Sequence, residues 1–76
     1  MNIEFDHQMG KNLRRLRKSR KLPQDQVAAK LQVMGCDVTR SALAKIEVGQ
    51  RYLYADEIRL LKDILQCSYE ELFREP

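Results

Sequence analysis

Apolar residues recur at intervals of three and four along most of this chain, the spacing that gathers side chains on one face of an α-helix. Met9, Leu13 and Leu16 form the first such stripe. No segment has the alternating pattern that would make a credible β-strand. The pattern predicts an all-α, compact domain of five helices, at about residues 9–20, 24–34, 40–48, 55–66 and 69–73.

Residues that begin and end helices stand at the edges of these stripes. Pro23 comes just before the second stripe, at a helix start where its missing N–H costs no hydrogen bond. Gly35 can adopt the left-handed conformation that closes a helix, and Thr39 suits the N-cap of the third helix. Ser68 and Glu71 have the spacing of a capping box, which supports a short fifth helix.

Length and composition indicate a folded domain. The chain has 76 residues, of which 43% are apolar and 33% are charged. We therefore expect one domain over residues 1–76, with residues 1–8 as a flexible N-terminal tail. No apolar run approaches the roughly 18 residues of a membrane span, and the N-terminus lacks the pattern of a secretory signal. Cys36 and Cys67 are far apart, which fits the reduced thiols of a cytoplasmic protein.

Charge is distributed unevenly along the sequence. The chain carries a net charge of +3, but residues 9–55 hold eleven Lys or Arg against three acids, a net +8. Residues 1–8 and 56–76 are acidic, at −2 and −3. A localised positive charge favours an anionic partner, most often nucleic acid. A merely solvated cationic face is the alternative that charge alone leaves open.

The third predicted helix has two different faces. Ala42, Leu43 and Ile46 share one side, which must pack inward. The other side has small residues, Ser41 and Ala44, at its centre, with cationic residues and Val48 around them. Small side chains allow a helix backbone to approach a surface closely, and flanking cations can contact phosphates or guanine edges. This is the face that a helix needs to enter the major groove of DNA.

The order and spacing of three segments, LPQDQVA, TRSALAKIEVGQR and LLKDILQCSYEELF, resemble the phage-repressor (Cro and cI) type of helix-turn-helix DNA-binding domain. The resemblance covers about residues 10–73. It implies a five-helix domain whose third helix reads bases in the major groove. Matching positions imply base contacts by Thr39, Arg40, Ser41, Ala44 and Lys45, phosphate contacts by Gln24, Gln50 and Arg51, and an ion pair between Arg17 and Glu47.

The ion pair also follows from the residues themselves. Arg17 and Glu47 each flank an apolar stripe, so each would be partly buried and would need a partner. The alternative is that the two side chains point into water independently.

The sequence departs from the family pattern in four places. The segment between Leu31 and Val38 is about five residues longer than the usual tight turn, so the second helix gains about one turn and ends at Gly35. The other departures concern helix ends: Pro23 replaces a Ser or Thr cap, Lys21 stands where Gly usually closes the first helix, and Leu53 with Tyr54 replaces Pro-Ser. A left-handed Lys21 would be strained by roughly 1 kcal/mol.

Other residues have ordinary interpretations. His7 has no second ligand at metal spacing, so no metal and no cofactor are expected. Cys36 is interpreted as a loop thiol and Cys67 as a small buried residue. No catalytic constellation can be nominated, which argues against an enzyme. The basic run of Lys11, Arg14, Arg15 and Lys18 lies on the outer face of the first helix and either contacts phosphates or only adds solubility.

The sequence therefore predicts a repressor-like transcriptional regulator, bacterial or phage in character, that binds a double-stranded DNA operator. The alternative is a protein-interaction module of the same fold, of antitoxin or anti-repressor type. One recognition helix covers only a few base pairs, so a homodimer on a palindromic site is expected. We expect the dimer interface at the C-terminal end, through Tyr69, Leu72 and Phe73.

Overall fold

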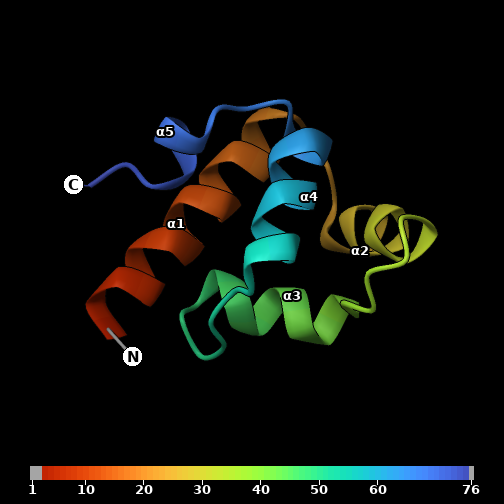
Figure 1. The fold of residues 1–76 in the computed structure, drawn as a ribbon, viewed down its shortest axis with the longest axis horizontal. Coiled ribbons are helices and arrows are strands. Elements are labelled where there is room, and N and C mark those ends of the chain that lie inside the picture. The colour runs from red at the N-terminus through yellow and green to blue at the C-terminus, as the bar shows by residue number, and fades with distance from the viewer. Residues whose placement is uncertain (1–2, 76) are drawn as a thin grey trace.

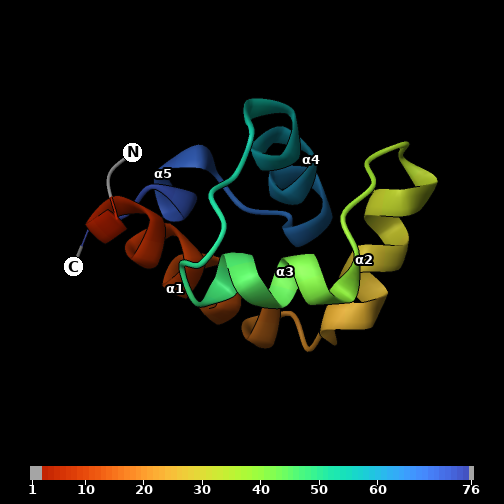
Figure 2. The same ribbon diagram turned by 90° about the horizontal axis from the view of Figure 1, so that it is seen from below.

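A computed structural model describes residues 3–75 of the chain. Within this range the chain forms five α-helices and no β-strand, as the stripes predict (Figure 1). Helix α3 lies across one end of the molecule, with α1 and α2 packed on it and α4 on its other side (Figure 2). The helices are α1 (Ile3–Ser19), α2 (Gln24–Val33), α3 (Arg40–Glu47), α4 (Ala55–Leu65) and α5 (Tyr69–Leu72).

The largest difference from the predicted helix ends is at the start of α1, where a flexible tail was expected. Helix α1 begins at Ile3, so residues 3–8 form its first turns, while residues 1 and 2 lie outside the described range. Glu4 and Asp6 in the first turn suit the positive end of the helix dipole. The ring of His7 lies against Gly49, where a side chain would collide with it. These residues are helical because they pack on the rest of the domain.

A single cluster of buried side chains joins the five helices. Leu13, Leu31, Leu43, Leu61 and Leu72 are each almost inaccessible, and every helix contributes at least one of them. Cys36 and Cys67 also belong to this cluster as free thiols. Cys36 lies in the α2–α3 connection, as the interpretation as a loop thiol requires, and it is also buried.

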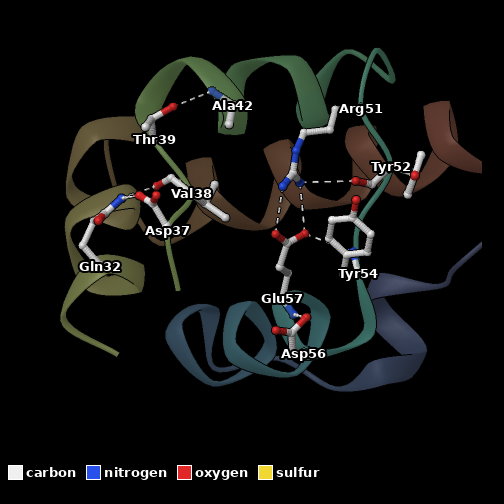
Figure 3. A network of polar contacts seen from close by, with 10 residues as sticks. All are labelled: Gln32, Asp37, Val38, Thr39, Ala42, Arg51, Tyr52, Tyr54, Asp56 and Glu57. Carbon is white, nitrogen blue, oxygen red and sulfur yellow. Dashed lines mark hydrogen bonds and ion pairs between the residues drawn. The ribbon is translucent and has the colours of Figure 1, made fainter. Parts of the chain in front are cut away.

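The lengthened α2–α3 connection is ordered by hydrogen bonds. Helix α2 ends at Val33, and Gly35 takes the predicted left-handed conformation with φ of +82°. The backbone N–H of Cys36 donates to the carbonyl of Leu31 at 2.8 Å. The side-chain amide of Gln32 donates to Asp37 Oδ1 and to the carbonyl of Val38, each at 3.1 Å (Figure 3). These bonds fix the approach of the chain to α3.

The C-terminal segment is held on α1 by a buried amide. Asn12 Nδ2 donates to the carbonyls of Leu72 and Arg74, both at 2.8 Å, and Asn12 Oδ1 accepts from Gln8. Leu72 is only 1% exposed because α5 turns it into the core. Its expected place in a dimer interface is therefore wrong. Tyr69 and Phe73, on the same short helix and its C-cap, remain exposed.

The end of α1 has the strained residue that the sequence suggests. Lys21 is left-handed with φ of 56°, in a position that Gly would occupy at lower cost. The preceding Arg20 donates to the carbonyls of Leu65 and Gln66, the last groups of α4. Helix α4 thereby gains a cationic partner at its negative end.

Candidate nucleic-acid interface

Helix α3 presents a mixed small and cationic surface to solvent. Arg40, Ser41 and Lys45 are exposed, and Ala44 is half-buried between them. Leu43 and Ile46 on the opposite side are buried in the core. The helix thus has the two faces that its sequence predicts. Its outer face can approach a surface closely at Ala44 and offers two cations at its margins.

The N-terminus of α3 is capped as expected. Thr39 precedes the helix with an extended backbone, and its hydroxyl oxygen accepts from the N–H of Ala42 at 3.1 Å (Figure 3). Val38, one residue earlier, is buried and packs in the same cluster as Leu43. This arrangement fixes where α3 begins. Thr39 and Arg40 consequently stand at a defined end of the helix.

A buried ion pair ties α3 to α1. Arg17 Nε donates to Glu47 Oε2 at 2.6 Å, and Arg17 Nη2 donates to Glu47 Oε1 at 2.9 Å. The carboxylate side chain is 3% exposed. The remaining donor, Arg17 Nη1, reaches the carbonyl of Leu22 at 2.8 Å. The pair expected from the sequence is present, and it also holds the loop between α1 and α2.

Close contact between α1 and α3 depends on Gly10. A Cβ at this position would overlap the backbone carbonyl oxygens of Ile46 and Glu47. Gly10 lies inside α1, where Gly costs conformational entropy relative to Ala. Here the missing side chain allows the two backbones to touch at the C-terminal end of α3.

Gln24, expected at a phosphate, is joined to the same network. Its Nε2 donates to Glu47 Oε1 at 3.0 Å. Gln24 is the first residue of α2, and Pro23 before it provides no side-chain cap. An amide nitrogen has two hydrogens, so one can bond Glu47 while the other points away from it. The structure therefore orients this side chain from the interior of the domain.

Arg51, also expected at a phosphate, faces inward. Its Nη1 and Nη2 donate to the two carboxylate oxygens of Glu57 at 3.0 and 2.9 Å (Figure 3). The guanidinium also lies 5.5 Å from the centre of the Tyr54 ring. Its charge is thus neutralised within the domain, whereas Gln50 beside it is exposed. Through these bonds Arg51 holds the α3–α4 loop against α4.

Glu57 stabilises the α3–α4 loop through bonds to two of its residues. In addition to Arg51, its Oε1 accepts from the backbone N–H of Tyr54, the residue before α4. Burial raises the pKa of Glu57, but the bonds from Arg51 and Tyr54 and the attraction of the guanidinium together hold the pKa below its usual value. Glu57 is therefore ionised at neutral pH, as an ion pair and an N-terminal cap require.

The described residues offer no sign of metal or thiol chemistry. Burial raises the pKa of both Cys36 and Cys67, so neither is an activated thiolate. Within residues 3–75, no three His, Cys, Asp or Glu side chains are grouped so that they could hold a metal ion. None of the helices in this range is long and apolar enough to cross a membrane.

Sequence reasoning missed three polar residues that support this surface: Asn12, Arg20 and Glu57. Asn12 and Arg20 bond backbone carbonyls more than forty positions away, and no local pattern indicates such partners. Glu57 had a detectable signal, because it stands three residues after the N-cap of α4, the Glu position of a capping box. Tyr54 at the N-cap in place of Ser or Thr concealed that motif.

Comparisons with known proteins agree with this geometry. The sequence matches the helix-turn-helix family HTH_3 over residues 13–72. Comparison with curated protein sequences gives no match. Among solved structures, the fold is similar to the crystal structure of the DNA-binding domain of BldD, with a TM-score of 0.80 and 25% identity over 96% of this chain and 99% of that chain. The chain belongs to the helix-turn-helix family, of the Cro and cI type.

Proposed function

We propose that this protein is a sequence-specific DNA-binding transcriptional regulator, repressor-like in action, whose α3 enters the major groove. The observation that carries the proposal is the exposed face of α3, where half-buried Ala44 lies between cationic Arg40 and Lys45. Membership of the helix-turn-helix family and similarity to a DNA-binding domain support it. Occlusion of an operator needs binding alone, so the function requires no catalytic group.

Each residue on this face has a role that its chemistry permits. Arg40 has the reach and the donors for a bidentate contact to guanine. Lys45 can donate to a guanine edge or a phosphate, and Ser41 can bond either kind of base edge. Ala44 gives the close approach and an apolar contact to a thymine methyl group. Thr39 accepts from Ala42 and still has its hydroxyl hydrogen to donate toward DNA.

Phosphate contacts on either side of the groove would fix the register of α3. Gln24 can donate one amide hydrogen to a phosphate while the other remains on Glu47. Gln50 lies exposed in the loop after α3 and can reach the backbone at the other side. For Arg51 we propose a supporting role instead, because a direct phosphate contact would have to compete with two bonds to Glu57.

The proposed operator complex is a homodimer on a two-fold site, with half-sites roughly 34 Å apart. Tyr69 and Phe73 remain the interface residues, at 46% and 40% exposure, whereas Leu72 has its place in the core. Phe5 widens this apolar surface, because its ring centre lies 5.8 Å from that of Phe73. Glu70 and Glu75 are exposed nearby in sequence and would repel their copies. A weak dimer stabilised by DNA is the expected outcome.

In vitro selection of bound duplexes at a stated salt concentration tests the function. We expect a two-fold symmetric motif, and Arg40→Ala should cost about 1–3 kcal/mol and relax preference at one base pair. Arg59→Ala, an exposed cation on α4, is the matched control and should leave base preference unchanged. Failure to select any motif would favour a protein-interaction module instead. Equal loss on every sequence would make Arg40 a phosphate contact.

Sedimentation with and without the selected duplex tests the dimer. The wild type should bind two copies per site, and Phe73→Lys should reduce the cooperativity of binding by placing a charge on the apolar surface. Val33→Lys is the control for added charge, because Val33 is an exposed apolar residue on α2 and belongs to neither α5 nor the ring contact. If Phe73→Lys still binds two per site with unchanged cooperativity, this interface is wrong.

A further inference from the structure

The outer face of α1 carries four cations that the domain itself does not use. Lys11, Arg14, Arg15 and Lys18 are all exposed. At about 100° per residue, their positions fall within roughly 100° of the helix circumference. Met9, Leu13 and Leu16 are buried on the side that faces the core. We name these four residues the α1 cationic face.

The α1 cationic face lacks the acidic side chains that usually lie among the basic ones on a solvated helix. Exposed helices mix both signs of charge, with acids and bases paired at i and i+4. Here Lys11 with Arg15, and Arg14 with Lys18, place like charges at that spacing, which destabilises a helix. Within residues 3–75, none of the salt bridges includes any of the four residues. The helix tolerates this repulsion without a partner inside the described part of the chain.

Among residues 3–75, no acidic side chain forms a salt bridge with the α1 cationic face. Glu4 and Asp6 belong to the first turn of α1, before the cations begin. The pKa of Glu71 on α5 is lowered mainly by the hydrogen bond from the backbone N–H of Ser68, and the positive charge of Arg15 lowers it further. These acids leave the centre of the α1 cationic face without a neutralising group. A polyanion outside the domain could relieve the repulsion along its whole length.

The position of this face in the fold favours DNA as that polyanion. Gly10 touches the backbone of Ile46, and Arg17 pairs with Glu47, so the cationic part of α1 crosses the C-terminal end of α3. Helix α1 runs obliquely past the C-terminal end of α3 in Figure 1 and lies partly behind α3 in Figure 2. A duplex bound on α3 continues beyond the base pairs that α3 reads. From Lys11 to Lys18 the helix rises ~10 Å, a length that about three phosphates of one strand cover.

We propose that the α1 cationic face is a second, sequence-independent contact that binds the sugar–phosphate backbone of DNA flanking the base pairs read by α3. This inference rests on the proposed DNA-binding function and extends its footprint. The face would add affinity and salt dependence without adding base preference, because phosphates carry no sequence information. It would also act only where DNA continues past the site.

A variant with all four residues changed to Gln tests this proposal. Gln keeps the side-chain length and helix propensity but removes the charge. A variant with Lys30→Gln and Arg59→Gln serves as the control, because both residues are exposed cations on other helices. Affinity is measured over a range of salt concentrations on two duplexes that share the selected site. One duplex has long flanks, and the other ends at the base pairs read by α3.

On the long duplex, the slope of log affinity against log salt should become shallower by about 0.9 for each phosphate that the variant no longer neutralises. The short duplex and the control variant should change little, and base preference should stay the same. The midpoint of thermal unfolding of the four-residue variant should be equal to or above that of the wild type, because repulsion is removed. A lower midpoint would mean that the cations have partners within the fold and would overturn the inference.

An unchanged slope on the long duplex would also overturn it, and so would equal losses of affinity on both duplexes. These results would leave the role of α3 intact as long as Arg40→Ala still alters base preference. If the wild type selects and binds no duplex at low salt, both the proposed function and this inference are wrong. The two failures are therefore distinguishable.

Discussion

Two bidentate arginine–glutamate pairs stand at the C-terminal end of α3, and they differ in how far along the chain they reach. Arg17 and Glu47 are 30 positions apart and join two helices. Arg51 and Glu57 are 6 positions apart and join a loop to the start of the next helix. The guanidinium side chains are 11% and 28% exposed, so the long-range pair is also the more deeply buried.

The difference separates two ways of supporting a binding surface. The Arg17–Glu47 pair can form only when α1 and α3 are already packed, and its loss leaves a charge inside the core. The Arg51–Glu57 pair lies within one connection, and water reaches its arginine. The first pair therefore acts on the stability of the whole domain. The second acts mainly on the shape of the loop that follows the recognition helix.

The largest expected effect is from Glu47→Ala. Removing this carboxylate strands the buried Arg17 and frees Gln24, so the free energy of unfolding should fall by about 3–5 kcal/mol. Urea denaturation of the single variants and of Arg17→Met with Glu47→Leu measures the coupling. The double variant should recover much of the loss, because two apolar side chains leave no buried charge. Additive losses would mean that the two residues do not interact.

Glu57→Ala should have an intermediate effect. It removes the partner of Arg51 and the acceptor for the N–H of Tyr54, and should cost about 1–3 kcal/mol of unfolding free energy in urea denaturation. Arg51→Ala should cost less than Glu57→Ala, because the cap at Tyr54 survives. If Glu57→Ala lowers the free energy of unfolding as much as Glu47→Ala does, the two pairs do not differ in their effect on stability.

The same comparison can be sharpened with DNA. If Arg51 only supports the loop, Arg51→Ala should change the salt slope of DNA binding by less than the roughly 0.9 expected when one phosphate is no longer neutralised. Gln50→Ala is the neighbouring control, and its decrease in affinity should be similar on all sequences. If the slope of log affinity against log salt is shallower by a full unit for Arg51→Ala, then Arg51 does contact a phosphate.

Lys21→Gly tests the loop that Arg17 also holds through the carbonyl of Leu22. Gly adopts φ of 56° without the cost that Lys bears, so the unfolding free energy should rise by up to about 1 kcal/mol. Thermal unfolding measures the change. Lys21→Ala is the control and should give no such gain, because Ala also has a Cβ. An equal gain with Ala would point to charge instead of backbone strain.

The smallest expected effect is the pH dependence from Glu57. Its pKa in the folded state lies below that in the unfolded state, about 4.3, so its stabilising contribution is complete above that pH. The contribution should be lost as pH falls through the folded-state pKa. Glu57→Gln should therefore flatten the decline of stability with acid, measured by denaturation between neutral and acidic pH. Glu71→Gln, at a more exposed carboxylate, is the control with a weaker expected change.

The sequence could predict those features whose causes lie within a few residues. The stripes at three and four residues placed the first four helices, although α1 begins earlier than predicted, and the capping box of Ser68 and Glu71 placed the fifth. Gly35 and Thr39 marked helix ends that the structure has. The outer face of α3 followed from the same periodicity. Local hydrogen bonds and side-chain spacing act along one helix, so a single helix contains the information needed.

Tertiary packing decided the features whose partners are distant in sequence. Residues 3–8 extend α1 to where the His7 ring lies against Gly49 and the Phe5 ring lies near that of Phe73. Leu72 is buried where Asn12 holds the end of α5 on α1. Arg51 turns inward because Glu57 lies at the start of α4 with a carboxylate that already caps the helix. A cation considered from the sequence alone looks available to DNA. Whether it is available depends on which acid the folded chain places beside it, because a carboxylate that accepts two hydrogen bonds from a guanidinium neutralises its charge within the domain.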